Sequence, residues 1–565
     1  MKYKFILIIS ILGVILSIVL SGIFLNFSYF EPDTASYLFQ AKLFTQGKIS
    51  IPVPIKTSDD GSPVQDPNGK PMPEYGLSPS PHINMLNGKW YSKYPFGNAL
   101  MLMFGEFFNA PWLIPALATG AAIFLLFLLV KDTYGKPIAF IAAVIALISP
   151  ATSGMGSTWF SEPVSRFYLT LFLFSLVRTL NGKGGIIYPL LSGFALGYAF
   201  NTRPLSAIVF GVVGAGFVLY HLYKLRLAKD SSNIEEENET NTPSQKQLVT
   251  RLGIFLIPFA LWVLVCMTWN HHFTGNPFKF THTAAQPYDK IGFGKRTESY
   301  YPDIERAWEF KPIHALNRPW RHILPCISFN ALGWGNYRPR LITEAKPSLK
   351  FFFDFLPLLI PWFFVLIPFF HSTRNRYDVL CMSFIVGCLI LYAFFYFEGS
   401  TWGFTPVNAR YYTEAIFLGF IPLAARGMYI LYQQFKKPIW TNKLAYVAGI
   451  CLLLLSVNTV WSYVRIGKVY QNWSAVYQKL PPLVKKFDIH NAVIFVPGTR
   501  DAPVGDYPFD SMEEANIVYF KLGPAPHWGL TNSDWKNVYK EYFKGRDAYL
   551  YEPGPNNIKP LIPDP

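Results

Sequence analysis

The feature that most constrains this chain is a series of long apolar stretches that recur along most of its length. Each approaches the ~20 residues that a helix needs to cross the hydrocarbon core of a bilayer, and almost none carries a charge near its centre. Charged residues make up 15% of the chain, against about 25% in ordinary soluble domains. We therefore expect an all-α polytopic membrane protein with about eleven transmembrane helices. The predicted spans cover residues 4–25, 111–131, 136–152, 162–180, 185–201, 204–224, 251–270, 351–371, 377–397, 411–433 and 442–464.

Basic residues between these stretches predict the orientation. With the N-terminus in the cytoplasm, only Arg203 and Arg410 fall in short external turns. The cytoplasmic segments then carry Lys2, Lys4, Lys131, Lys136, Arg178, Lys183, Arg374, Arg376, Lys436, Lys437 and Lys443. This asymmetry follows the positive-inside rule and explains much of the net charge of +15 without a nucleic-acid partner. We expect a multi-pass protein of the inner (plasma) membrane.

Residues 1–464 are predicted to form a membrane module, and residues 465–565 a small extracytoplasmic α/β domain. In the latter, NAVIFVPG, ANIVYFKLG and RDAYLYEP predict strands, and SDWKNVYKEYF predicts a helix. Three long loops interrupt the module. They are the first external loop (26–98, with an amphipathic helix expected at 33–46), a polar cytoplasmic loop expected to be disordered (225–250), and an external loop whose fold the sequence does not specify (271–350).

The chain contains no P-loop, GxGxxG, HExxH, CxxC or GxSxG motif, which argues against P-loop ATPases and the commonest hydrolases. We expect no structural disulfide, because Cys326 is the one cysteine clearly in an external loop. His82, His271, His272 and His282 are external, but their spacing does not match a metal site. No metal site or cofactor is predicted, and a metal requirement stays open.

The first group of candidate site residues lies in the first external loop. Asp33, in FEPDTASY, is either a helix-capping carboxylate or a general base at the membrane surface, with Glu31 as a weaker candidate. Lys93, in WYSKYPFG, is either a snorkelling lysine or a phosphate ligand assisted by the neighbouring Tyr94. In each case both interpretations stay open.

The second group lies at the predicted outer ends of spans. Glu162 and Arg166 are four residues apart, so that they could pair on one helix face, and this is favoured over a catalytic role. Arg203 stands in a short turn without an acidic neighbour in sequence, so we expect it to bind an anion such as a lipid phosphate. Arg410 fits the same logic, because guanidinium groups suit phosphate oxygens, and Tyr411 beside it also fits an aromatic belt.

One reaction would use all of these groups. If the substrate were a sugar carried on a polyprenyl phosphate, phosphate would be a good leaving group that needs no general acid. Direct displacement would then need one carboxylate to accept the proton of the acceptor hydroxyl, and cations to hold the departing phosphate. Asp33, Lys93, Arg203 and Arg410 would meet that requirement. A single in-line attack would invert the anomeric centre.

The chain also resembles the GT-C superfamily of membrane glycosyltransferases, in particular family-39-like proteins similar to protein O-mannosyltransferases and the lipid A aminoarabinose transferase. The resemblance is carried, in order, by PDTASYLFQAKLFTQGKIS, GKWYSKYPFGNALML, WLIPALATG, GYAFNTRPLSA, FTGNPFKF and NARYYTEAIFLGF. It implies that Asp33 is the catalytic acid residue of the first loop and that Lys93 binds the donor phosphate. Many mannosyltransferase relatives have adjacent Asp-Glu where this chain has Asp33-Thr34, which leaves the sugar and the role of Glu31 open.

Two other functions compete with this hypothesis. A multi-pass transporter or lipid flippase would also have polar groups near span ends, but its binding site is expected near the bilayer midplane between repeated halves. A non-catalytic relative with an anchoring role is the third possibility. The expected partners of the enzyme are a polyprenyl-phosphate sugar, the bilayer, and an acceptor that could be a lipid, a glycan or a protein.

Overall fold

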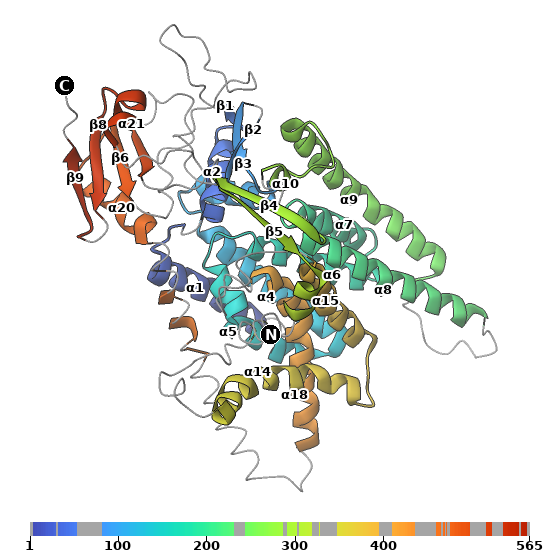
Figure 1. The fold of residues 1–565 in the computed structure, drawn as a ribbon. Helices are drawn as coiled ribbons and strands as arrows, with labels where there is room; N and C mark the ends of the chain where they lie inside the picture. Colours follow the sequence, from blue (N-terminus) through green and yellow to red (C-terminus); the bar gives the residue numbers. More distant parts are fainter. Residues whose placement is uncertain are drawn as a thin grey trace. The chain divides into compact units, whose positions relative to one another are not determined.

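The structure is a computed structural model of the whole chain (Figure 1). Its contacts divide the chain into two units, built from residues 1–20, 115–266 and 311–467 and from residues 21–114, 267–310 and 468–565. Each unit is described by itself. The structure describes residues 4–29, 32–52, 82–86, 88–230, 243–285, 291–301, 304–318, 347–394, 410–435, 475–497, 516–522, 535–552 and 555–561, with short pieces at 327, 331, 459–460, 462–464, 467–468 and 471.

The first unit is a bundle of apolar helices. Its main elements are α1 (Lys4–Leu20), α4 (Leu113–Tyr134), α5 (Lys136–Ile148), the π-helical turn η3 (Pro150–Gly154), α6 (Glu162–Leu180), α7 (Ile187–Phe200), α8 (Pro204–Asp230), α9 (Gln245–Thr274), α14 (Pro347–Phe370), α15 (Arg376–Ala393), η6 (Arg410–Tyr412), α17 (Thr413–Ala415), η7 (Ile416–Phe420) and α18 (Ile421–Phe435). Helix α6 packs along α7 and is buried on almost every face, as expected of a helix at the centre of a bundle. Helix α14 packs along α18, and α8 along α15.

Among the residues that the structure describes, six helices are long and apolar enough to cross a membrane. They are Lys4–Leu25, Leu113–Tyr134, Pro204–Leu227, Gln245–Thr274, Arg376–Ala393 and Arg410–Gln434. Each overlaps a predicted span. The predicted spans 136–152, 185–201 and 351–371 correspond to the shorter apolar helices Lys136–Ile148, Ile187–Phe200 and Leu359–Phe370, and 162–180 corresponds to α6. Most of 442–464 lies outside the described residues, so the number eleven stays a prediction.

Small residues permit close helix contacts in this bundle. A Cβ atom at Gly193 of α7 would collide with the carbonyl oxygen of Phe255 in α9. A Cβ atom at Gly427 of α18 would likewise collide with the carbonyl oxygen of Phe364 in α14. Membrane helices commonly use such small residues, because close backbone approach increases the van der Waals contact between helices.

The second unit begins with the first loop of the sequence. The helix expected at 33–46 is α2 (Pro32–Thr45), which packs against α3 (Gly97–Glu106). Its predicted amphipathic character is wrong, because residues 33–41 are buried on every side of the helix and no polar face is left for solvent. The same unit contains a three-stranded antiparallel sheet, in which the strand order is β1 (Ile51–Pro52), β3 (Lys89–Ser92) and β2 (Ile83–Leu86). The later loop, whose fold the sequence did not specify, contains helix α10 (Thr281–Ala285) and an antiparallel pair, β4 (Gly294–Tyr301) and β5 (Ile304–Phe310).

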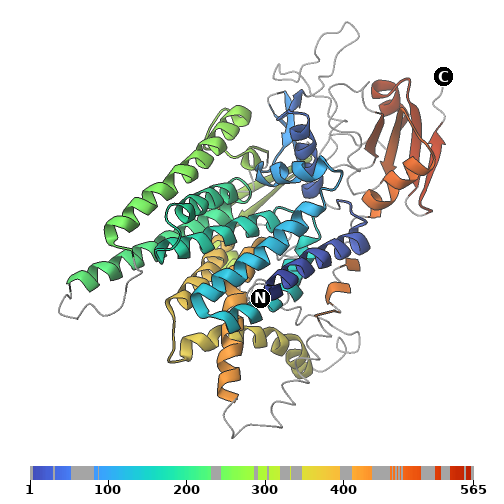
Figure 2. The same ribbon diagram turned by 180° about the vertical axis from the view of Figure 1, so that it is seen from behind.

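The end of the chain forms a four-stranded sheet between two helices, labelled in Figure 1 and seen from behind in Figure 2. The strand order is β7 (Ile517–Leu522), β6 (Ala492–Pro497), β8 (Asp547–Glu552) and β9 (Asn557–Leu561), with β6 parallel to β7 and β8. Successive side chains of β6 point to opposite faces of the sheet, so that neighbouring residues contact different helices. Ile494 packs with Leu480 of α20 (Ala475–Lys486), whereas the neighbouring Phe495 contacts Trp535 of α21 (Trp535–Tyr542) and Phe543.

Candidate functional site

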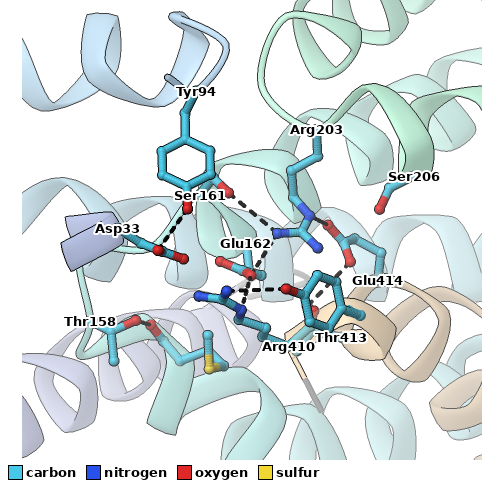
Figure 3. A network of polar contacts seen from close by, with 12 residues as sticks. Asp33, Tyr94, Thr158, Ser161, Glu162, Arg203, Ser206, Arg410, Thr413 and Glu414 are labelled. Atoms are coloured by element: carbon cyan, nitrogen blue, oxygen red, sulfur yellow. Dashed lines mark hydrogen bonds and ion pairs between the residues drawn. The ribbon is translucent and has the colours of Figure 1, made fainter. Parts of the chain in front are cut away.

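Asp33 lies in the first turn of α2, where the positive end of the helix dipole stabilises a carboxylate. The residue is only 7% exposed. Its Oδ1 accepts a hydrogen bond of 2.6 Å from the Tyr94 hydroxyl, as Figure 3 shows, and lies 3.2 Å from Nε2 of His82. Two polar groups therefore hold one oxygen of a nearly buried carboxylate.

Lys93 lies beside Tyr94 at the end of β3. Its Nζ is 4.9 Å from the centre of the Tyr94 ring, and the residue is 3% exposed. The rings of Tyr37, His82 and His282 also lie within 4.9–5.8 Å of the Tyr94 ring. The predicted residues Asp33 and Lys93 thus both contact the third predicted residue, Tyr94. We call Asp33, His82, Lys93, Tyr94 and His282 the Asp33 cluster.

Buried polar contacts fix the backbone around this cluster. The carbonyl oxygen of His82 accepts a hydrogen bond from Oγ of Ser36 in α2 (2.7 Å) and another from the amide of Lys93 (3.1 Å). Oγ of Thr281 in α10 donates to the carbonyl oxygen of Lys93 at 2.9 Å. Nearby in β3, burial raises the pKa of Tyr91 to about 12, so its phenol stays neutral. Three separate segments of the sequence therefore hold the cluster in place.

A second group of charges lies in the helical bundle. Nη1 of Arg203 is 2.6 Å from Oε1 of Glu162, and its Nε is 3.0 Å from Oε1 of Glu414. Nε of Arg410 lies 4.0 Å from the same oxygen of Glu162. Figure 3 shows Arg203 between the two carboxylates, which are 1% and 0% exposed. We call these four residues the Arg–Glu cluster; its two positive and two negative side chains balance in formal charge.

The expected pair between Glu162 and Arg166 is wrong for the part of the chain that the structure describes. The guanidinium of Arg166 instead donates to the carbonyl oxygens of Ala151 (2.6 Å) and Thr152 (3.1 Å). It also donates to Oγ1 of Thr119 at 3.1 Å. The reason is that Arg166 is wholly buried, so that its guanidinium needs acceptors, and the carbonyl groups of η3 supply two of them.

Arg203 was expected to bind an anion such as a lipid phosphate. In the structure, the anions beside it are the carboxylates of Glu162 and Glu414. Arg410 keeps the predicted neighbour Tyr411, whose hydroxyl accepts a hydrogen bond of 3.1 Å from Nη2. Its guanidinium also lies 4.7 Å from the ring centre of Phe160. Whether these residues bind substrate stays a prediction.

Sequence reasoning did not select Glu414 or His82 as site residues. Glu414 could have been found, because an acidic residue within an apolar span is costly unless it has a partner. His82 carried no local signal, because its contact with Asp33 depends on the folding of the first loop.

Glu31 lies outside the described residues, as do Cys326 and Cys451. Cys266, Cys381 and Cys388 form no disulfide. Within the ranges that the structure covers, no three His, Cys, Asp or Glu side chains group in a way that could hold a metal ion.

Comparison with known proteins identifies relatives for part of the sequence. The family model described as Dolichyl-phosphate-mannose-protein mannosyltransferase matches residues 96–231, a region that contains Glu162 and Arg203 but not Asp33 or Lys93. The curated protein "Putative mannosyltransferase YkcB" of Bacillus subtilis is 31% identical over 121 residues, which is 21% of this chain. The match spans only 16% of the length of that relative.

Solved structures match almost the whole chain. The chain is similar to ArnT from Cupriavidus metallidurans in the apo state, with a TM-score of 0.53, and bound to undecaprenyl phosphate, with a TM-score of 0.51. Each match has 12% sequence identity and covers 97% of this chain and 93% of the other. At this identity the likeness shows the fold alone. None of these relatives favours the transporter alternative. By its fold and by its matched region, the chain resembles the GT-C superfamily of membrane glycosyltransferases.

Proposed function

We propose that this protein is a membrane glycosyltransferase that moves a sugar from a polyprenyl-phosphate donor to an acceptor at the extracytoplasmic face. The observation that carries the proposal is the Asp33 cluster, in which a nearly buried carboxylate and a buried lysine share one aromatic neighbour. The ArnT structure with undecaprenyl phosphate and the description of the matched family support a lipid-linked donor.

Asp33 would act as the general base. The acceptor hydroxyl would lose its proton to the carboxylate while its oxygen attacks the anomeric carbon of the donor. The bond from that carbon to the phosphate oxygen would break, and its electron pair would leave with the polyprenyl phosphate. Because the attack is a single in-line displacement, the product would have the inverted anomeric configuration. A positioned base typically contributes 10²–10⁴-fold to such a step.

Lys93 would bind the donor phosphate. Its ammonium group is nearly buried, and an ammonium removed from water gains more from an anionic partner than one in bulk solvent. The ring of Tyr94 would keep the ammonium in place through a cation–π contact. The leaving phosphate would therefore meet a fixed positive charge as its own negative charge increases.

In the helical bundle, Arg410 and Arg203 would have different roles. Arg203 is held between two carboxylates, so we assign it the task of orienting Glu162 and Glu414. Arg410 would bind an anionic substrate group, because a guanidinium suits phosphate or carboxylate oxygens. Tyr411 would orient that guanidinium through its hydroxyl.

The test is direct. Purified protein in lipid nanodiscs is incubated with polyprenyl-phosphate sugars that carry a radioactive sugar, and donor loss is followed with candidate lipid, glycan and peptide acceptors. We expect the wild-type protein to consume at least one donor and to release polyprenyl phosphate. The product is analysed for its anomeric configuration, which should be opposite to that of the donor.

The matched control is a second aspartate of the same unit. Asp488 is exposed and also lies 3.0 Å from a histidine, His490. We expect Asp33→Asn to abolish donor consumption and Asp488→Asn to leave it unchanged. Equal turnover in Asp33→Asn and wild type would remove Asp33 from the mechanism, and retention of configuration would exclude the single displacement.

A further inference from the structure

We propose that Thr281, in the short helix α10 of the later loop, is a positioning residue that acts through Lys93. Its hydroxyl holds the backbone carbonyl of Lys93 and thereby fixes the ammonium group where a lipid phosphate would bind. The proposal rests on the proposed function, because it takes Lys93 as the ligand of the donor phosphate. Thr281 lies outside the region that the family model matches, and no sequence pattern singles it out.

The contact between the two residues is short and buried. Oγ1 of Thr281 donates to the carbonyl oxygen of Lys93 at 2.9 Å, and the two residues are 1% and 3% exposed. They are 188 positions apart in the sequence, so that the bond joins the first loop to the later one. A buried carbonyl group that loses its donor is destabilised, because no water replaces the lost hydrogen bond. The folded state therefore favours keeping this contact.

Both loops hold the turn that carries Lys93. Within the first loop, the amide of Ser92 donates to Oε1 of Gln40 at 3.0 Å, and the amide of Lys93 donates to the carbonyl oxygen of His82 at 3.1 Å. From the later loop, Thr281 supplies a donor to the carbonyl oxygen of Lys93. The amide and the carbonyl group of Lys93 are thus held from different loops, and both loops determine where its side chain begins.

Helix α10 is itself held against the first loop. Nδ2 of Asn84 in β2 donates to the backbone carbonyl oxygen of Thr281 at 3.3 Å. The ring of His282, the next residue of α10, lies 5.8 Å from the ring of Tyr94, over which the ammonium of Lys93 sits at 4.9 Å. Two consecutive residues of α10 therefore reach the backbone and the aromatic neighbour of Lys93, which is the arrangement that a positioning role requires.

The position of the ammonium matters because its contacts with phosphate act over a short range. A charge-assisted hydrogen bond from nitrogen to oxygen spans about 2.7–2.9 Å and weakens steeply when the geometry departs from this range. The side chain of Lys93 is nearly buried, so it has little freedom to compensate for a shift of its backbone. Loss of the Thr281 hydroxyl should therefore weaken phosphate binding more than it affects proton transfer to Asp33, which lies on α2.

The first measurement follows Lys93 itself and needs no substrate. Protein in nanodiscs is treated with a water-soluble acetylating reagent, and the rate of acetylation at Lys93 is measured by peptide mass spectrometry relative to the exposed Lys544. Thr281→Val keeps the branched shape but lacks the hydroxyl, so local opening should become more frequent and the rate at Lys93 should rise about tenfold. Thr281→Ser keeps the hydroxyl and should stay within about twofold of wild type.

The matched control is Thr45→Val. The hydroxyl of Thr45 also donates to the backbone carbonyl oxygen of a lysine, Lys42, at 2.7 Å, but at the end of α2. This variant should leave the rate at Lys93 unchanged. If Thr281→Val does not fold, Thr281→Ala replaces it, because no methyl group then presses on the carbonyl oxygen. An unchanged rate at Lys93 overturns the proposal, and so does an equal rise in Thr45→Val.

The second measurement tests whether Thr281 acts through Lys93. Binding of fluorescent polyprenyl phosphate is measured for Thr281→Val, Lys93→Met and the double variant. We expect Thr281→Val to weaken binding about tenfold in the wild-type background but less than about twofold beside Lys93→Met, because the contact that it supports is then already lost. Full additivity would overturn the proposal. In sugar transfer, the donor KM should rise about tenfold in Thr281→Val, while kcat at saturating donor stays unchanged.

The two proposals fail in different ways. If Asp33→Asn abolishes sugar transfer while Thr281→Val changes neither the acetylation of Lys93 nor lipid binding, the positioning role is wrong and the transferase stands. If wild-type protein transfers no sugar but Thr281→Val exposes Lys93 and weakens lipid binding, the positioning role stands and the proposed function is wrong. A wild-type protein that does not bind polyprenyl phosphate would overturn the positioning role, because Lys93 would then have no phosphate to hold.

Discussion

The Asp33 cluster and the Arg–Glu cluster both hold nearly buried carboxylates, but they neutralise them differently. In the Asp33 cluster, the described contacts to the carboxylate come from a phenol and an imidazole. In the Arg–Glu cluster, Arg203 lies between two carboxylates at 2.6 and 3.0 Å. The first arrangement places polar side chains beside its carboxylate, whereas the second places a guanidinium beside each of its two carboxylates.

This difference indicates different tasks. A carboxylate that contacts a phenol and an imidazole can exchange a proton without separating a buried ion pair with a guanidinium. Removing the arginine from a buried ion pair instead leaves an uncompensated charge, which is strongly destabilising. We therefore expect the Asp33 cluster to control the chemical step, and Arg203 with Glu162 and Glu414 to control the stability and geometry of the bundle.

The largest effect is expected for Asp33→Asn. Asparagine keeps the size of the side chain but cannot act as a base, so kcat should fall by about 10²–10⁴-fold. The unfolding temperature should change little, since the amide oxygen can still accept from Tyr94. Turnover of the labelled donor and thermal unfolding in nanodiscs measure the two quantities. If Asp33→Asn lost stability and kept its turnover, Asp33 would have a structural role and not a chemical one.

The next effect concerns stability. Arg203→Met leaves Glu162 and Glu414 buried without their nearest cation, which should destabilise the bundle by about 3–5 kcal/mol. Denaturant unfolding monitored by tryptophan fluorescence provides the measurement. Arg226→Met, at an exposed arginine of α8, should have almost no effect. If Arg203→Met unfolds like wild type but binds donor poorly, the arginine is a substrate ligand and the assignment of the two clusters is wrong.

A smaller effect should separate binding from chemistry within the Asp33 cluster. Lys93→Met removes the ammonium but keeps the apolar stem against Tyr94, so donor affinity should weaken by about 10–100-fold. Binding of fluorescent polyprenyl phosphate measures this directly. Lys279→Met, at an exposed lysine of the same unit, is the control. Unaltered affinity would remove Lys93 from phosphate binding.

The smallest effect is expected for Tyr94→Phe. The ring and its packing remain, and only the 2.6 Å hydrogen bond to Asp33 is lost. Since His82 still contacts the same oxygen, turnover should fall by about tenfold, the equivalent of one hydrogen bond to a charged group. Tyr411→Phe, in which Arg410 loses a neutral partner, should change turnover less. A greater loss in Tyr411→Phe would indicate that the chemical step depends more on the Arg–Glu cluster.

The helical part of the fold was predictable because hydrophobic length is a strong local signal. Helix α2 (Pro32–Thr45) matches the expected 33–46, and α15 (Arg376–Ala393) begins one residue before the expected 377. The small sheets in the two long loops were not predicted. The strand β4 (Gly294–Tyr301) has the sequence GKRTESYY, which lacks the apolar alternation of a half-buried strand, and its pairing partner cannot be read from local sequence.

The candidate site was predictable only in part, because a sequence pattern carries information about local contacts and not about tertiary ones. Asp33, Lys93 and Tyr94 could be selected because each stands in a distinctive local pattern beside an apolar span. The partners of the charged residues could not, because they come from distant parts of the sequence. The i, i+4 rule paired Glu162 with Arg166, whereas the folded bundle pairs Glu162 with Arg203. A local rule cannot anticipate a tertiary contact that satisfies both charges better.

The contacts of Arg166 have a consequence for how the chain enters the bilayer. An arginine at the centre of an inserted helix costs about 2.5–3.5 kcal/mol, and one near a helix end, as Arg166 is in α6, costs less; carbonyl groups without donors in hydrocarbon add to that cost. In this protein the guanidinium on α6 donates to the carbonyls of Ala151 and Thr152, which follow α5. These hydrogen bonds reduce the insertion cost of both segments, and they form only when both segments are present. The two segments should therefore leave the translocon as a hairpin, and a ribosome stalled after α5 alone should expose an intermediate that the insertion machinery must retain.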